Sequence, residues 1–216
     1  MGTKFSTRVW VSVVGIASIF FGSKGYADTV ISVADFGLKP DTRENAVAYV
    51  QKAIEACRGK EPVTLVFPEG RYDFWPQYAH EKNYYETNTY DVFPKRLAML
   101  FEGLHNITVD GNGSQFVMHD RIQPITVENC DGVTLKNFSI DWDIPLTAQA
   151  RVTKVGSDFF EIEINVLESP YIIEDGKLVF VGEGWKSALG SMIEFESDTH
   201  FVVPGTGDLG LGRNWR

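Results

Sequence analysis

The chain has 216 residues, of which 29 are acidic and 20 are basic, giving a net charge of −9 at pH 7. This acidic balance is unfavourable for nucleic acid, whose binders need clustered lysine and arginine to displace counterions. Two cysteines, Cys57 and Cys130, are too few for a disulfide framework, and we expect both to be small buried residues.

The first 27 residues have the pattern of a signal peptide. Lys4 and Arg8 precede an uncharged apolar run over residues 9–22, and Gly25 and Ala27 are small residues at the two positions that a signal peptidase reads. The run is shorter than the roughly 20 residues that a membrane span needs. We therefore expect cleavage after Ala27 and secretion. Cleavage moves the net charge from −9 to −12, because it removes three basic residues and no acid.

The mature chain is predicted to open with a strand, a helix and two more strands. The helix can be capped by Asp41 or Thr42 and ended by Gly59, and its apolar residues recur at helical spacing. The strands are expected over residues 30–33, 63–67 and 71–74. We expect a helix at this position to cover the open end of the fold that the following strands form.

Residues 75–96 form a long polar stretch rich in aromatic rings. Loops of this length inside compact domains are usually functional or disordered, and the rings argue against disorder. Two interpretations remain open: the rings cover the side of the fold, or they face a carbohydrate, whose C–H faces suit flat apolar surfaces. The rings are those of Trp75, Tyr78, Tyr84, Tyr85, Tyr90 and Phe93.

Residues 99–109 are echoed by residues 125–135, an offset of 26. Short alternating apolar strands with Asn, Asp and Gly corners at such a period are typical of solenoid coils that share one core. We predict that residues 28–146 form the first coils of a right-handed parallel β-helix. The mature chain is short for such a solenoid and its end shows no cap, so we expect a truncated β-helix.

The solenoid pattern gives way to antiparallel strands near residue 147. A hairpin is predicted from residues 151–155 and 160–166, and further strands follow at 178–181, 192–195 and 201–203. We interpret residues 147–204 as an inserted antiparallel β-barrel or sandwich, and residues 205–216 as the start of a return to the β-helix.

A second alignment, at an offset of 22, pairs residues 116–118 with residues 138–140 and predicts the chemistry of the outer face. If Phe138 and Ile140 point inward, Asp141 and Asp143 point outward. The same alignment places His119 beside Asp141 and Arg121 beside Asp143, because adjacent strands lie about 4.8 Å apart.

Three roles suit this outer face. Carboxylates two residues apart on one strand match the separation of about 6.5 to 9.5 Å between the acid and base of an inverting glycosidase, which makes Asp141 and Asp143 catalytic candidates. The other two roles are a sugar-binding site and a salt-bridged ladder without catalysis. Candidates for substrate binding are His119, Arg121, Asp141, Trp142, Asp143, Trp75, Tyr84 and Tyr85.

No cofactor or metal is expected. The four histidines have no metal-ligand spacing. Residues 110–114 resemble the start of a calcium loop, but Arg121 stands where an EF-hand needs glutamate, so this segment is a coil corner.

Several segments carry a family resemblance. Residues 32–37 and 65–72 resemble the opening of the pectate-lyase-like parallel β-helix superfamily. Residues 70–75, 84–88, 94–97 and 137–149 resemble the α-1,3-galactosidases of glycoside hydrolase family 110, and the last run is the most specific. The second resemblance covers essentially all of the mature chain.

The resemblance implies a secreted or periplasmic bacterial enzyme that removes terminal α-1,3-linked galactose from glycans, with inversion and without a metal. Family members are considerably longer, and their catalytic carboxylates lie in later coils. The chain is therefore expected to be the N-terminal portion of such an enzyme and to be inactive alone. A polysaccharide lyase and a non-catalytic glycan-binding β-helix are the alternatives, and the absence of a basic coil face counts against the lyase.

Overall fold

The structure is a computed structural model that describes residues 29–84, 94–206 and 209–210. The expected signal peptide, residues 1–27, and the candidate Tyr85 lie outside the described residues. No helix in the described part of the chain is long and apolar enough to cross a membrane.

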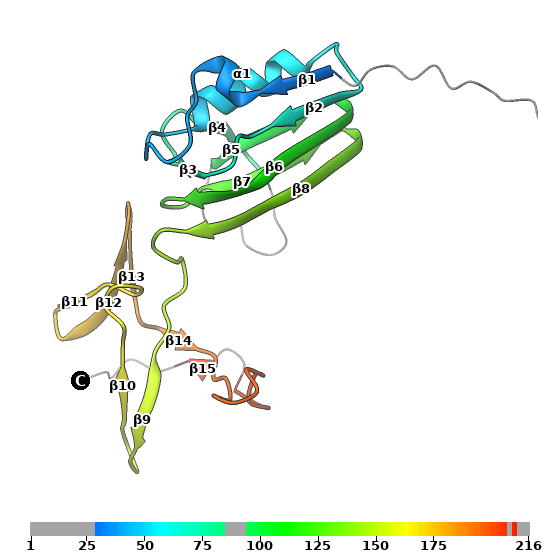
Figure 1. Ribbon diagram of the computed structural model, residues 1–216. Helices are drawn as coiled ribbons and strands as arrows, with labels where there is room; N and C mark the ends of the chain where they lie inside the picture. Colours follow the sequence, from blue (N-terminus) through cyan, green and yellow to red (C-terminus); the bar gives the residue numbers. More distant parts are fainter. Residues whose placement is uncertain (1–28, 85–93, 207–208, 211–216) are drawn as a thin grey trace, which may run out of the picture.

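Up to residue 142, the described residues form one α-helix, one 3-10 helix and eight strands, which Figure 1 shows in place. The predicted strands near residues 30, 63 and 71 are confirmed, within one or two residues at each end. The elements are β1 (Thr29–Ser32), η1 (Val33–Phe36), α1 (Val47–Cys57), β2 (Val63–Val66), β3 (Arg71–Phe74), β4 (His80–Lys82), β5 (Lys95–Glu102), β6 (His105–Met118), β7 (Gln123–Glu128) and β8 (Asp131–Trp142).

These strands form two sheets, and from β5 to β8 the chain alternates between them. One sheet has the order β1-β2-β6-β3, with β8 on the other side of β6, and all of its pairings are parallel. In the other, β5 pairs with β7 in parallel and with β4 antiparallel. The predicted offset of 26 is confirmed in both sheets, where Met99 pairs with Ile125 and Ile107 pairs with Val133.

The predicted offset of 22 is wrong. Beyond the corner, Ser114 pairs with Phe138 and Met118 with Trp142, an offset of 24. The prediction treated residues 111–114 as an insertion without counterpart, whereas β6 runs through the corner. Between the pairs Asp110–Lys136 and Ser114–Phe138 the register shifts by two residues, not by four.

The close approach of β8 to this corner requires glycine on β6. A Cβ atom added to Gly111 would lie 2.5 Å from Cβ of Phe138 and 2.7 Å from the carbonyl oxygen of Asn137. Asn112 and Asn137 take up the bend with φ angles of 49° and 60°, a region that asparagine tolerates better than most residues.

The helix begins later than predicted. Neither Asp41 nor Thr42 caps α1, which starts at Val47, and Asn45 Oδ1 accepts the hydrogen bond from the Val47 amide instead. Asp41 is used elsewhere, since its Oδ1 accepts a hydrogen bond from the Arg71 amide. The segment before α1 is thus held by β3, where Asn45 forms an isolated bridge with Asp73.

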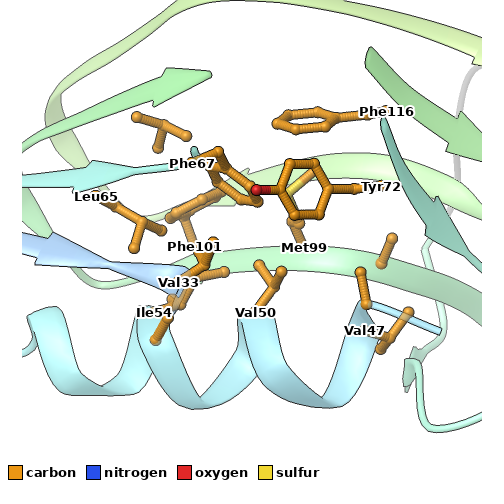
Figure 2. Close-up of a cluster of buried hydrophobic side chains, with 14 of the residues drawn as sticks. Val33, Val47, Val50, Ile54, Leu65, Phe67, Tyr72, Met99, Phe101 and Phe116 are labelled. Carbon is orange, nitrogen blue, oxygen red and sulfur yellow. The ribbon is translucent and has the colours of Figure 1, made fainter. Parts of the chain in front are cut away.

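The core lies between α1 and the two sheets (Figure 2). Its centre is aromatic: the Phe116 ring lies 4.7 Å from the Phe67 ring and 5.7 Å from the Phe74 ring. Phe138 stacks on Phe116 at 4.8 Å, so the prediction that Phe138 points inward is confirmed. The helix contributes Val47, Val50 and Ile54, which close one end of this core as predicted.

The remaining strands are antiparallel and form sheets separate from the parallel ones (Figure 1). The predicted hairpin is confirmed as β9 and β10, and the predicted strand at 178–181 lies within β12. Near 192–195 and 201–203 the structure has only a short strand and one bridge, between Phe195 and Val202. The elements are β9 (Arg151–Val155), β10 (Phe160–Glu163), β11 (Tyr171–Glu174), β12 (Lys177–Gly182), β13 (Trp185–Ala188), β14 (Ser191–Met192) and β15 (Leu209–Gly210).

Candidate functional site

Three strands of the larger sheet end side by side and bring polar residues to one edge. The His119 amide donates to the carbonyl of Phe74 at 2.9 Å, and the Asp143 amide donates to the carbonyl of Met118 at 3.0 Å. Because these strands are parallel and in register, Trp75, His119 and Asp143 follow β3, β6 and β8 at equivalent positions. The edge therefore stacks an aromatic ring, an imidazole and a carboxylate from three neighbouring strands.

Asp73 is the centre of this edge. Its side chain is fully buried, and its Oδ1 accepts hydrogen bonds from Nε and Nη2 of Arg71 at 3.0 and 2.6 Å. Oδ1 also lies 2.9 Å from Nε2 of His119 and 3.6 Å from Nη1 of Arg43. Burial opposes ionisation of this carboxyl, but hydrogen bonds from Arg71 and His119 together outweigh it and lower its pKa.

Arg71 joins Asp73 to Asp143. Its Nη2 donates to Oδ1 of Asp143 at 2.7 Å, and Arg43 lies 3.6 Å from the same oxygen. The hydrogen bond from Arg71 lowers the pKa of Asp143, and the hydrogen bond to Asp73 raises the pKa of Arg71. Both carboxyl groups are therefore ionised near neutral pH. Asp143 keeps 39% of its side chain exposed, so it is open to a ligand as well.

His119 is held on three sides. Its ring stacks on Trp75 with centroids 3.8 Å apart and planes inclined by 13°. Nε2 faces Asp73, and Nδ1 lies 2.7 Å from Oε2 of Glu183. With a carboxylate at each nitrogen and only 3% of the side chain exposed, His119 is a positioning group in this arrangement.

Glu183 belongs to a hairpin tip that docks beside β6. Residues 119–121 meet residues 183–185 in order: His119 meets Glu183, and Arg121 lies 5.9 Å from the Trp185 ring centroid. Between them, Gly184 is so close that an added Cβ atom would lie 2.3 Å from Oδ2 of Asp120. The tip that joins β12 to β13 thus completes the polar edge from the antiparallel part of the chain.

The structure separates some of the predicted site residues. Asp141 pairs in register with Val117 and lies exposed, away from His119, because the offset is 24. Asp143 takes the place beside His119 and is neutralised by Arg71 and Arg43, whereas Arg121 reaches Trp185. Salt bridges therefore occur at this face as expected, but they join other residues than those predicted.

Two of the aromatic candidates contact protein groups away from the outer face. Trp142 packs against the core, and its Nε1 donates to the carbonyl of Asp120 at 3.2 Å. The Tyr84 hydroxyl donates to Glu128, which also lies 2.8 Å from Nζ of Lys82. Trp75 is therefore the predicted ring that the described structure places at the polar edge.

Ligand atoms of Asp73, His119 and Asp143 all lie within 4.8 Å of one another, a grouping that the sequence spacing did not suggest. A cation between them would compete with Arg71, whose Nη2 already contacts both carboxylates. With two arginines balancing the two aspartates, the donor set fits an ion-pair network better than a metal centre.

Comparison with known proteins gives this edge a context. The chain is 60% identical over 190 residues to α-1,3-galactosidase B of Bacteroides thetaiotaomicron, an alignment covering 88% of the chain and 30% of that protein. It is 36% identical over 169 residues to α-1,3-galactosidase A of Shewanella woodyi, an alignment covering 77% of the chain and 28% of that protein. It is also 36% identical over 205 residues to α-1,3-galactosidase B of Phocaeicola vulgatus, which covers 93% of the chain and 32% of that protein. The expected resemblance is confirmed. The chain is related to the α-1,3-galactosidases.

The chain spans about 30% of the length of these α-1,3-galactosidases. A family model described as GLAA-B β-barrel domain I matches residues 148–215, which include the antiparallel strands from β9 onward. Glu183 therefore lies within the segment that this family model matches, while Asp73, His119 and Asp143 lie in or directly after strands of the parallel sheet.

Sequence reasoning missed four residues of this edge, namely Arg43, Arg71, Asp73 and Glu183. A signal for two of them was present: Arg71 and Asp73 alternate on a strand, which puts both side chains on one face. Arg43 and Glu183 lie outside regular strands, and no periodicity points to them.

The docking of the hairpin tip can be tested with Glu183→Gln. The amide keeps the shape but loses the charge-assisted contact to His119, so we expect the docking to weaken by about 1 kcal/mol and amides 183–185 to exchange roughly fivefold faster with deuterium. Glu174→Gln is the matched control, because it breaks the 3.1 Å pair with Lys186 in the same sheet. Equal exchange in the two variants would contradict the role of Glu183.

Proposed function

We propose that the chain forms the first coils and the first inserted barrel of a secreted or periplasmic exo-α-1,3-galactosidase that inverts the configuration at the anomeric carbon. The observation that carries this proposal is the 60% identity over 190 residues to α-1,3-galactosidase B. The names of the relatives favour hydrolysis of galactosides over the lyase alternative. Because the chain spans about 30% of their length, the activity belongs to the longer protein.

The fold proposed for the N-terminal part is a right-handed parallel β-helix. Parallel pairing at an offset of 26 in two sheets supports it, as does the alternation of the chain between them. On the last strands the apolar side chains of Val127, Leu135 and Ile140 are 46%, 39% and 38% exposed, which is the surface that a further coil covers.

The polar edge is proposed as one wall of the galactose pocket. Asp143 is ionised and partly open, so it can accept hydrogen bonds from sugar hydroxyls while Arg71 holds it in place. A carboxylate whose pKa is lowered in this way is a poor general acid. We therefore assign Asp143 to binding and place the catalytic acid and base in the part of the relatives that this chain does not span.

Galactose release tests the proposal in the protein extended to the length of its relatives. The expected activity is release of galactose from the disaccharide Galα1-3Gal, with β-galactose appearing first in the NMR spectrum because the configuration inverts. Asp143→Ala is expected to lower kcat/KM about 10- to 100-fold, since hydrogen bonds to a charged group contribute about 1.5 to 3 kcal/mol. Asp141→Ala, which changes an exposed carboxylate two residues earlier, is the matched variant with a smaller effect.

Two outcomes would count against the proposal in different ways. Absence of galactose release from any α-galactoside removes the assigned activity. Release that is unchanged in Asp143→Ala keeps the activity and removes the polar edge from the pocket.

A further inference from the structure

A cleft lies between α1 and the segment that follows β3, outside the polar edge. It is a shallow cleft of about 400 Å3 that is open to solvent, so a ligand here would stay partly exposed. It is lined by Glu44, Asn45, Ala48, Tyr49, Lys52 and Tyr78.

The far wall of the cleft is held in place through its backbone. Asn45 Nδ2 donates to the carbonyls of Gln77 and Trp75 at 2.9 and 3.4 Å. Gln51 Nε2 donates to the carbonyl of Tyr78 at 2.9 Å. Three hydrogen bonds from side chains at the helix therefore fix residues 75–78 without using the Tyr78 side chain.

Tyr78 itself has an unusual backbone conformation and an exposed ring. Its φ angle is 69°, in the left-handed region that a bulky residue rarely adopts, and 65% of the residue is exposed. Folding gains little from an aromatic ring kept in water on a strained backbone, and such strain concentrates at binding sites. Tyr49 stands on the helix side of the same cleft.

The lining selects a class of ligand. Two tyrosines offer flat apolar faces with polar edges, which match a ring whose faces are C–H and whose rim is hydroxyl. Glu44 accepts hydrogen bonds, Lys52 donates them, and their charges balance, so neither an anion nor a cation is favoured. We propose that this cleft is a saccharide-binding site, separate from the polar edge.

The segment 75–78 links the two sites. Trp75 stacks on His119 at one end, and Tyr78 stands in the cleft at the other, so their α-carbons are at most about 11 Å apart. A glycan longer than a disaccharide would be long enough to span this distance. The cleft thus holds inner sugar units of a glycan whose terminal galactose lies at the polar edge; this choice of sugar rests on the proposed function.

The test is a titration of the chain with a trisaccharide that ends in Galα1-3Gal, followed by NMR chemical shifts. Shifts are expected at Tyr49, Lys52 and Tyr78, and Tyr78→Ala is expected to raise the Kd at least about tenfold, while Tyr78→Phe keeps most of the affinity because the ring face remains. Tyr171→Ala removes a partly exposed tyrosine of the antiparallel part and serves as the matched control.

The outcomes separate this site from the proposed activity. Shifts confined to other residues, an unchanged Kd in Tyr78→Ala, or tighter binding of inorganic phosphate than of the sugar would overturn the cleft as a saccharide site. In the extended protein, Tyr78→Ala is expected to raise KM for a longer glycan and to leave kcat for Galα1-3Gal unchanged. If neither the unchanged extended protein nor its variants release galactose, the proposed activity is contradicted and the saccharide site in the cleft is not.

Discussion

Replacing Asp73 with alanine is expected to lower the free energy of unfolding by about 3 to 5 kcal/mol, because truncating one partner of a buried ion pair leaves the other uncompensated. Asp73 is fully buried and holds Arg71 at 2.6 Å and His119 at 2.9 Å. Without it, Arg71 keeps only Asp143 among these acceptors, and His119 loses the partner at Nε2. Urea denaturation followed by circular dichroism measures the change.

Asp141→Ala is the control for this prediction. It removes an equivalent carboxylate from the same sheet, but Asp141 is exposed, so the expected change is within about 0.5 kcal/mol. Similar losses in the two variants would mean that the network around Asp73 contributes nothing specific to stability.

The same network gives the fold an acid-sensitive component. The pKa values of Asp73 and Asp143 lie below their ordinary value of 3.8, so the unfolded chain binds protons at a higher pH than the folded chain. The stability from these groups is therefore fully present above about pH 5 and is lost as the pH falls through 4 and below. In Asp73→Asn, stability is expected to vary less between pH 5 and pH 3 than in the unchanged chain.

Much of the fold could be predicted from the sequence because its signals are periodic. The echo of residues 99–109 in residues 125–135 fixed the offset of 26, and alternation of apolar residues located the hairpin of β9 and β10. The start of α1 was predicted too early because Asp41 and Thr42 have the chemistry of helix caps. In the structure Asp41 instead accepts the amide of Arg71, a contact that local propensity does not register.

The site was predicted in kind and not in its partners. Asp143 and His119 were both expected on the outer face, but an error of two residues at the corner of residues 111–114 paired each with the wrong neighbour. Side-chain direction has a period of two along a strand. An error of two residues therefore left each side chain on the correct face but paired it with the wrong residue of the neighbouring strand. Glu183 reaches the edge from 64 residues away along the chain, a distance that no motif spans.

The second large effect is expected for Phe116→Ala, which removes the centre of the aromatic core. Phe116 is fully buried, and its ring centroid lies 4.7 Å from that of Phe67, 5.7 Å from that of Phe74 and 4.8 Å from that of Phe138. Phenylalanine-to-alanine changes in such cores cost about 3 to 5 kcal/mol, through lost burial and the cavity left behind. Rigid strands on both sides limit how far the walls can collapse into the space.

The position of Phe116 makes this loss more than local. Phe138 stacks on Phe116 from the neighbouring strand β8, so the substitution also loosens β8, which Asp143 follows directly. We therefore expect Phe116→Ala to lower the denaturation midpoint and to speed deuterium exchange in residues 138–142. Phe201→Ala, which removes a phenylalanine that is 73% exposed, should leave both unchanged. A destabilised variant with normal exchange in residues 138–142 would show that β6 and β8 are not coupled through these rings.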